Sequence, residues 1–195
     1  GYFGFEPRRP IAGCIDDLRR RAAAIADLSR RCGLAGGYQN HHGKQLGGSV
    51  WDLQAVLDGI DPRWLGCQYD IRHAAAEATG SWEVGWRRIA PHVTSLALKD
   101  FRWDDRQPLR PVTVPSGTGL VPWPRFIAAV VATPPLLPAR SIPLTAHCEF
   151  FHLDADEQSL DAAARQRIAV EQLSQEAVFL AAAIAPLEPA AAAIP

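Results

Sequence analysis

Helical and strand-like segments alternate along most of the chain, and this alternation constrains the fold more than any other feature. An apolar repeat at three- and four-residue steps predicts a helix over 11–32, ended by Gly33. Further helices are expected over about 51–59 (with Ser49 as N-cap), 81–93, 122–132 and 158–185. Strands are expected at about 34–40, 64–70, 94–100 and 142–150, and loops at 71–80 and 101–121.

Each connection between the expected strands is long enough to be a crossover, so the strands are predicted to be parallel neighbours in chain order. Helices must then cover the sheet, which leaves two α/β architectures: a doubly wound open sheet or part of a (β/α)8 barrel. Neither a GxGxxG motif nor a P-loop follows the first strand. Their absence makes a nucleotide-binding open sheet the weaker alternative.

Composition bounds the remaining options. The 195 residues include no Met, so we expect the sequence to be part of a longer protein. We assign 1–185 to one barrel-type domain and 186–195 to a flexible Ala/Pro tail. A net charge of −1 without basic runs argues against a nucleic-acid partner. No run of about 18 apolar residues predicts a membrane span, and the first ten residues are no signal peptide. A cytoplasmic location is favoured.

Polar and ionisable side chains follow every predicted strand. In parallel α/β folds, functional residues gather at the carboxyl ends of the strands, so we expect these residues to form one site. His147 and Glu149 are two residues apart on a strand and share a face. The four strand ends carry Gln39, Asn40, His41 and His42; Asp70, Arg72 and His73; Lys99 and Asp100; and His147 and Glu149.

Each candidate also has a structural interpretation. Lys99 and Asp100 can form an ion pair, and Asp70 can cap the segment that contains His73. His42 is expected to face solvent, and His147 can be a satisfied barrel histidine. Glu149 is the hardest to explain structurally, because a carboxylate in an apolar run is costly to bury without a cation or several donors.

The order and spacing of several motifs resemble a known family. YQNHHG, VWDL, DP, QYDIRHA, SW, IAPHV, LALKDF, a GxG loop and HCEF are similar to the sugar phosphate isomerase/epimerase group of xylose-isomerase-like TIM barrels, over most of residues 1–152. The resemblance implies an incomplete (β/α)8 barrel that covers about strands four or five to eight. The whole protein is then expected to be longer, because the full fold needs eight strands and roughly 250 residues.

The resemblance also implies a divalent metal (Mn, Mg or Zn) held at strand ends, usually by Glu, Asp, His and Glu. In this sequence the matching positions are Gln39, Asp70, Ala97 and Glu149, so the implied ligands are Gln39, Asp70 and Glu149. Gln39 removes one negative charge from the usual set, and Ala97 cannot coordinate. The histidine of the D-x-x-H motif matches His73.

The implied activity is that of a sugar or sugar-phosphate isomerase or epimerase, which moves a proton beside a carbonyl. Its catalytic residues are expected to be His41, His73, Lys99, His147 and Glu149. A keto-sugar lyase or dehydratase, and a barrel that binds sugar without turnover, remain alternatives. The hypothesis of an AP-endonuclease-like activity fits this sequence less well, because that activity needs a His-rich cluster of three zinc ions and a basic face for DNA. The expected partner is a small sugar, with a homo-oligomer as a further option.

Overall fold

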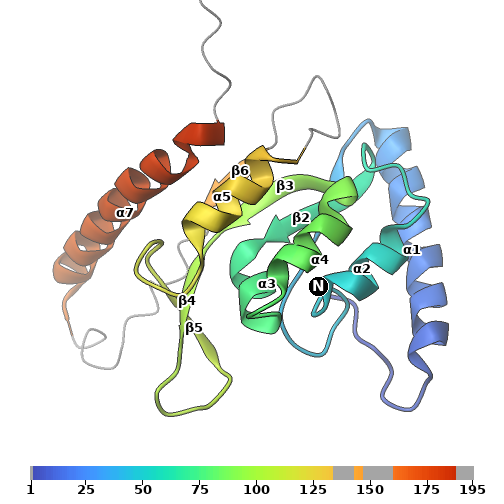
Figure 1. Cartoon of the computed structure of the whole chain (residues 1–195), viewed down its shortest axis with the longest axis horizontal. Coiled ribbons are helices and arrows are strands. Elements are labelled where there is room, and N and C mark those ends of the chain that lie inside the picture. The colour runs from blue at the N-terminus through green and yellow to red at the C-terminus, as the bar shows by residue number, and fades with distance from the viewer. Residues whose placement is uncertain (1, 134–142, 147–159, 188–195) are drawn as a thin grey trace, which may run out of the picture. The chain divides into compact units, whose positions relative to one another are not determined.

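The computed structural model describes residues 2–133, 143–146 and 160–187 (Figure 1). Two compact units divide the chain: 1–98 with 134–145, and 99–133 with 146–195. The elements are α1 (Ile11–Cys32), β1 (Gly36–Gln39), α2 (Val50–Leu57), β2 (Leu65–Asp70), α3 (Ile71–Glu77), α4 (Trp82–Ile89), η1 (Ala90–His92), β3 (Val93–Leu98), β4 (Asp100–Trp103), β5 (Pro111–Val114), α5 (Trp123–Val131), β6 (Leu144–Ala146), α7 (Ala162–Ile184) and η3 (Ala185–Leu187).

The main sheet has the strand order β1-β2-β3-β6, which confirms the predicted succession of neighbours. β1 pairs with β2 in parallel, with Gln39 opposite Gln68. β2 pairs with β3 in parallel, with Asp70 opposite Ala97. The carboxyl ends of β1, β2 and β3 therefore lie at one edge of the sheet, where the sequence predicts the site.

Alternation along β2 separates the two faces of this sheet. Tyr69 is fully buried and meets Trp86 of α4 edge to face, with ring centroids 4.9 Å apart. Cys67 lies on the same face as Tyr69, toward the helices, because successive side chains of a strand point to opposite faces. Gln68 and Asp70 consequently point to the other face, away from that contact.

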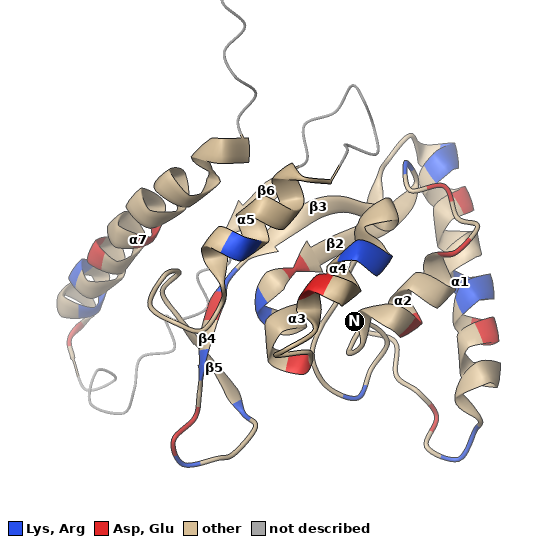
Figure 2. Ribbon diagram, viewed as in Figure 1, with Lys and Arg blue, Asp and Glu red and all other residues tan. Residues whose placement is uncertain are grey.

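Local signals set the helix ends as expected. The Ser49 hydroxyl accepts a hydrogen bond from the Trp51 N–H at the start of α2. Gly33 ends α1 in the left-handed conformation, with φ 66°. Arg and Asp are interspersed along α1 (Figure 2), and ion pairs such as Arg30–Asp27 join them. This pattern agrees with a solvated charged face.

Two predicted loops contain regular structure. Residues 71–77 form α3, whose first turn is capped by the Asp70 carboxylate accepting from the His73 N–H at 3.2 Å. The segment is only seven residues long and buried at most positions, so it has no polar face to reveal its period. The loop expected at 101–121 includes the antiparallel hairpin β4–β5, and the strand expected to reach Asp100 ends at Leu98.

The second unit contains the hairpin, α5 and α7. Buried Glu176 of α7 accepts hydrogen bonds from the N–H and the hydroxyl of Ser116, at 2.6 and 2.5 Å. Among the described residues, the stretch Ala162–Leu187 is long and apolar enough to cross a membrane by length and composition. Core helices of soluble proteins pass the same test, so this is weak evidence, and the expected lack of a membrane partner stays a prediction.

Candidate functional site

Gln39 and Asp70 meet at the carboxyl ends of β1 and β2. The amide nitrogen of Gln39 donates to Asp70 Oδ2 at 2.7 Å, although the residues are 31 positions apart in the sequence. Asp70 is fully buried, and its other oxygen caps α3. Asp70 is therefore both the cap that the structural interpretation predicts and part of the strand-end cluster.

Asn40 joins the same two strand ends through the main chain. Its amide nitrogen donates to the Asp70 carbonyl at 3.0 Å, and its amide oxygen accepts from the Asp70 N–H at 2.7 Å. Asn40 is 1% exposed, so both bonds are shielded from water. The sequence places Asn40 at a strand end, but no local pattern shows that it holds Asp70.

Three histidines come together beside Asp70. His42 Nδ1 lies 2.7 Å from His73 Nδ1, and the ring of His41 lies across that of His73 with centroids 3.9 Å apart. Arg72 Nη1 approaches His73 Nδ1 at 3.1 Å. The expectation that His42 faces solvent is wrong, because its ring is half-buried against His73.

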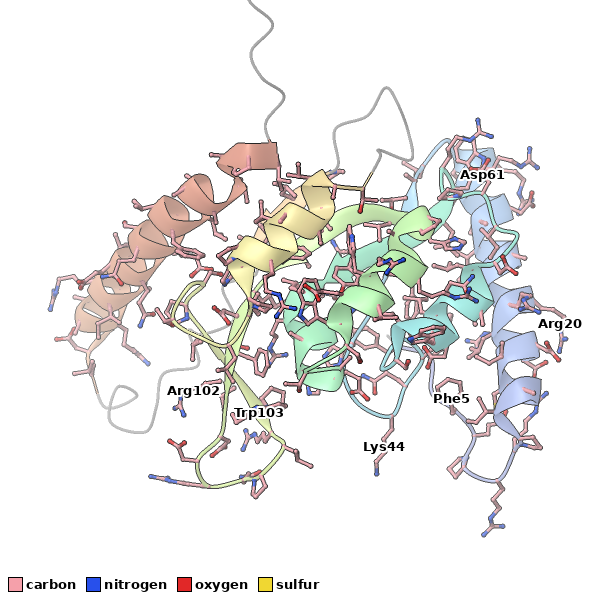
Figure 3. All side chains as sticks on the ribbon, viewed as in Figure 1. Phe5, Arg20, Lys44, Asp61, Arg102 and Trp103 are labelled. Carbon is pink, nitrogen blue, oxygen red and sulfur yellow. The ribbon has the colours of Figure 1, made fainter. Side chains whose placement is uncertain are left out.

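The loop that carries His41 and His42 is anchored by two carboxylates. Glu77 accepts from the Gly43 N–H at 3.2 Å, and Asp52 accepts from the Gly47 N–H at 3.0 Å. Burial of Asp52 raises the pKa of its carboxyl to about 6. Lys44, at the tip of this loop, extends away from the ribbon (Figure 3) and contributes no charge to the cluster.

Tyr2 is a site residue that the sequence analysis missed. Its hydroxyl donates to the amide oxygen of Gln39 at 3.0 Å, and its ring centroid lies 4.7 Å from that of His41. An aromatic residue near the start of a sequence has no spacing relation to the strand ends. Only the tertiary fold brings it beside them.

Lys99 and Asp100 belong to the second unit. Lys99 is buried there, and Asp100 is fully buried. Five N–H groups donate to the Asp100 carboxylate at 2.8–3.1 Å. They come from the main chain of Phe101, Gly117, Gly119 and Val121 and from the indole of Trp123. Asp100 thus organises the 116–123 loop of its own unit.

The described residues include two members of the predicted metal set, Gln39 and Asp70. Asp70 offers a carboxylate oxygen, and Ala97, which is not a member of the set, offers no metal ligand. The Gln39 amide turns its oxygen to Tyr2 and its nitrogen to Asp70. His147 and Glu149 lie outside the described residues, so metal binding by Gln39, Asp70 and Glu149 stays a prediction.

The three histidines have ring nitrogens within 4.8 Å of one another, which is close enough for a metal site. The ring of His41 is tilted by 34° against that of His73. His42 Nδ1 and His73 Nδ1 already contact each other at 2.7 Å, so as arranged the cluster can also transfer a proton between ring nitrogens.

A cavity of about 810 Å³ in the second unit offers no such chemistry. Its lining comes from α5, α7, η3 and the 117–122 loop, and none of the lining residues has a titratable side chain. The titratable cluster at the ends of β1 and β2 is therefore the stronger candidate for a site.

Comparisons with known proteins concern the fold of the chain. A family model described as xylose isomerase-like TIM barrel matches residues 1–134. No curated protein matches the sequence. Similar solved structures include the probable 3-DHS dehydratase AsbF from Bacillus anthracis, with TM-score 0.57 and 14% identity over 86% of this chain and 61% of that one.

Two further structures are similar to about the same degree. A D-tagatose 3-epimerase-like protein gives TM-score 0.54 and 17% identity over 92% of this chain and 62% of that one. A xylose isomerase domain protein from Planctomyces limnophilus gives TM-score 0.52 and 19% identity, over 92% of this chain and 56% of that one. The chain spans less than two thirds of the length of each of these proteins. At these identities the likeness concerns the fold.

Proposed function

The chain belongs to the xylose isomerase-like TIM-barrel family, and on that premise we propose that it is an enzyme that transfers a proton beside the carbonyl of a small sugar or sugar-derived substrate. Its parallel sheet with helices is an incomplete barrel of this family. The observation that carries the proposal is the hydrogen-bonded cluster of Gln39, Asp70, His73 and His42 at the carboxyl ends of β1 and β2.

This cluster has the groups that such a reaction needs. Imidazoles exchange protons near neutral pH, and removal of a proton from carbon requires a base held in one orientation. Asp70, buried and tied to Gln39 and to α3, supplies a fixed acceptor beside His73. Tyr2 and Gln39 add hydroxyl and amide groups of the kind that bind sugar hydroxyls. No step of the proposal passes through a metal.

The other predicted catalytic residues remain part of the proposal. His41 lies within the cluster, against the rings of both Tyr2 and His73. Lys99 is proposed to stabilise negative charge on the substrate oxygen, and His147 and Glu149 to complete the proton-transfer groups of the whole site.

Isomerase or epimerase activity is the first candidate, and dehydration of a keto compound is the second. Both begin with the same removal of a proton beside a carbonyl; they differ in whether the proton returns to carbon or a hydroxyl leaves as water. The similar structures described as epimerase-like and as a dehydratase support each candidate.

Proton exchange in deuterated water tests the proposal. The chain is incubated with D-fructose, D-tagatose and 3-dehydroshikimate, and each compound is analysed by NMR and mass spectrometry. An isomerase or epimerase incorporates deuterium beside the carbonyl without loss of water, whereas a dehydratase gives a product lighter by one water. Binding of a compound without exchange would support the non-catalytic alternative, and neither binding nor exchange would contradict the proposal.

A further inference from the structure

The contact between His42 and His73 is an edge-to-edge hydrogen bond between two imidazoles. The two Nδ1 atoms are 2.7 Å apart, the ring centroids are 4.9 Å apart and the planes differ by 23°. With the nitrogens so much closer than the centroids, the rings point toward each other instead of lying face to face. Two lone pairs cannot face each other at this distance, so one proton lies between the nitrogens.

Arg72 favours His42 as the donor of this proton. A guanidinium has only donors, and Arg72 Nη1 is 3.1 Å from His73 Nδ1, so a hydrogen on His73 Nδ1 would face an N–H of Arg72. His73 Nδ1 therefore accepts, and its one lone pair is shared between the closer His42 Nδ1 and the more distant Arg72 Nη1. The proton of neutral His73 is then on Nε2, which lies 3.6 Å from Asp70 Oδ2. His73 and Asp70 are almost completely buried, which protects this arrangement from water.

The tautomer of His42 follows. Because His73 Nδ1 accepts, His42 Nδ1 carries the hydrogen and donates it, and the basic lone pair of His42 is on Nε2. His42 is half-buried, and its backbone lies in the loop between β1 and α2, next to the strand ends. A hydrogen bond from another residue to one ring nitrogen of a histidine fixes the tautomer, and this leaves the other nitrogen as the one that exchanges protons.

We propose that His42 Nε2 takes the proton from the substrate, and that His73, Arg72 and Asp70 are positioning residues that set its tautomer. This inference rests on the proposed function. In the step, the substrate C–H bond breaks, its electron pair remains on the substrate as an enediolate, and the proton forms the Nε2–H bond of a His42 imidazolium. In an isomerisation, the imidazolium keeps its Nδ1–H bond to His73 and returns the Nε2 proton to the neighbouring carbon of the enediolate.

The test combines a tautomer measurement with kinetics. Nitrogen-15 NMR of the histidine-labelled chain should show His42 protonated at Nδ1 and His73 at Nε2. His42→Asn keeps an amide N–H near the position of Nδ1 but has no basic nitrogen. It should lower kcat for deuterium exchange of the reactive compound by about 10²- to 10⁴-fold, with KM changed by less than about threefold.

Controls separate a catalytic from a structural role. His92→Asn changes a half-buried histidine in η1, at the amino end of β3, and should leave exchange unchanged. In His42→Ala, added imidazole should restore part of the exchange, which a structural role would not allow. Arg72→Lys keeps the charge without the planar donor and should alter the tautomer signals of His42 and His73.

The outcomes are distinct. Near-normal kcat in His42→Asn would overturn the role of His42 while leaving the proposed function intact. Spectra with His73 protonated at Nδ1 would overturn the positioning role of Arg72. If the wild type exchanges none of the compounds, the proposed function fails and the catalytic role of His42 fails with it, whereas the spectra still decide the tautomers.

Discussion

Asn40 and Asp70 hold each other by two hydrogen bonds between one side-chain amide and the main chain. The bonds cross from the end of β1 to the end of β2, at the point where ladder pairing between the two strands stops. The Asn40 amide thus takes the place of the next backbone pairing between β1 and β2. The position of the Asp70 carboxylate, and of the histidines around it, depends on this step.

Asn40→Ala should lower the free energy of unfolding by about 2–4 kcal/mol, because it leaves the buried N–H and carbonyl of Asp70 without these partners. Chemical denaturation measures the change. Gln107→Ala, which removes an exposed amide, should change stability by less than about 0.5 kcal/mol. Equal effects of the two substitutions would contradict the role given to Asn40.

Asp100→Asn should destabilise the chain by about 3–5 kcal/mol, because an amide group turns its own N–H toward some of the five donors that now face a carboxylate. The loop lies close against this carboxylate, since a Cβ added at Gly119 would clash with Asp100 Oδ1. Thermal melts of this variant and of exposed Asp105→Asn provide the comparison. A melting temperature like that of the Asp105 variant would show that the loop does not depend on Asp100.

Asp52→Asn should make stability less dependent on pH. The pKa of this carboxyl is about 6 in the folded chain, against an ordinary pKa of 3.8, so between these pH values the folded state holds a proton that the unfolded state has lost. The wild type therefore loses stability as pH rises through this window. The Asn side chain stays neutral and can still accept from the Gly47 N–H.

The variant should consequently be more stable than the wild type at pH 8, by on the order of 1 kcal/mol after allowance for solvent screening, and about equal below pH 4. Denaturant titrations at several pH values measure this difference. Asp58→Asn, at the exposed end of α2, is the control. A difference between Asp52→Asn and wild type that does not vary with pH would contradict the assignment.

Gln39→Glu should create a stronger site for a hard divalent cation. The new carboxylate would lie where the Gln39 amide now meets Asp70 at 2.7 Å, and two carboxylates so close favour a bound cation. Calorimetric titration with Mn²⁺ should give a Kd at least about tenfold lower than for the wild type. Gln68→Glu adds the same charge to the same sheet face and is the control. An equal gain in Mn²⁺ affinity in this variant would show that the contact of residue 39 with Asp70 does not create the site.

The sequence identifies the elements whose signals are local. The apolar period of α1, the Ser49 cap and the turn at Gly33 lie within a few residues of the elements they define, and each was predicted. α3 was missed because its start depends on a cap by Asp70 and its short, buried sequence lacks a polar face. The β4–β5 hairpin was missed because its strands lie in a segment rich in Pro and Gly.

The sequence by itself also determined that the polar ends of these strands share one edge, where the candidate site lies, because parallel strands bring their carboxyl ends to one edge whatever their exact register. Which side chains meet there was decided only by the tertiary structure. Gln39 with Asp70, His42 with His73 and Tyr2 with Gln39 are each separated by more than 30 positions. Hydrogen bonds act over about 3 Å, so a contact between such distant residues depends on strand register and loop path, and neither is encoded in local spacing.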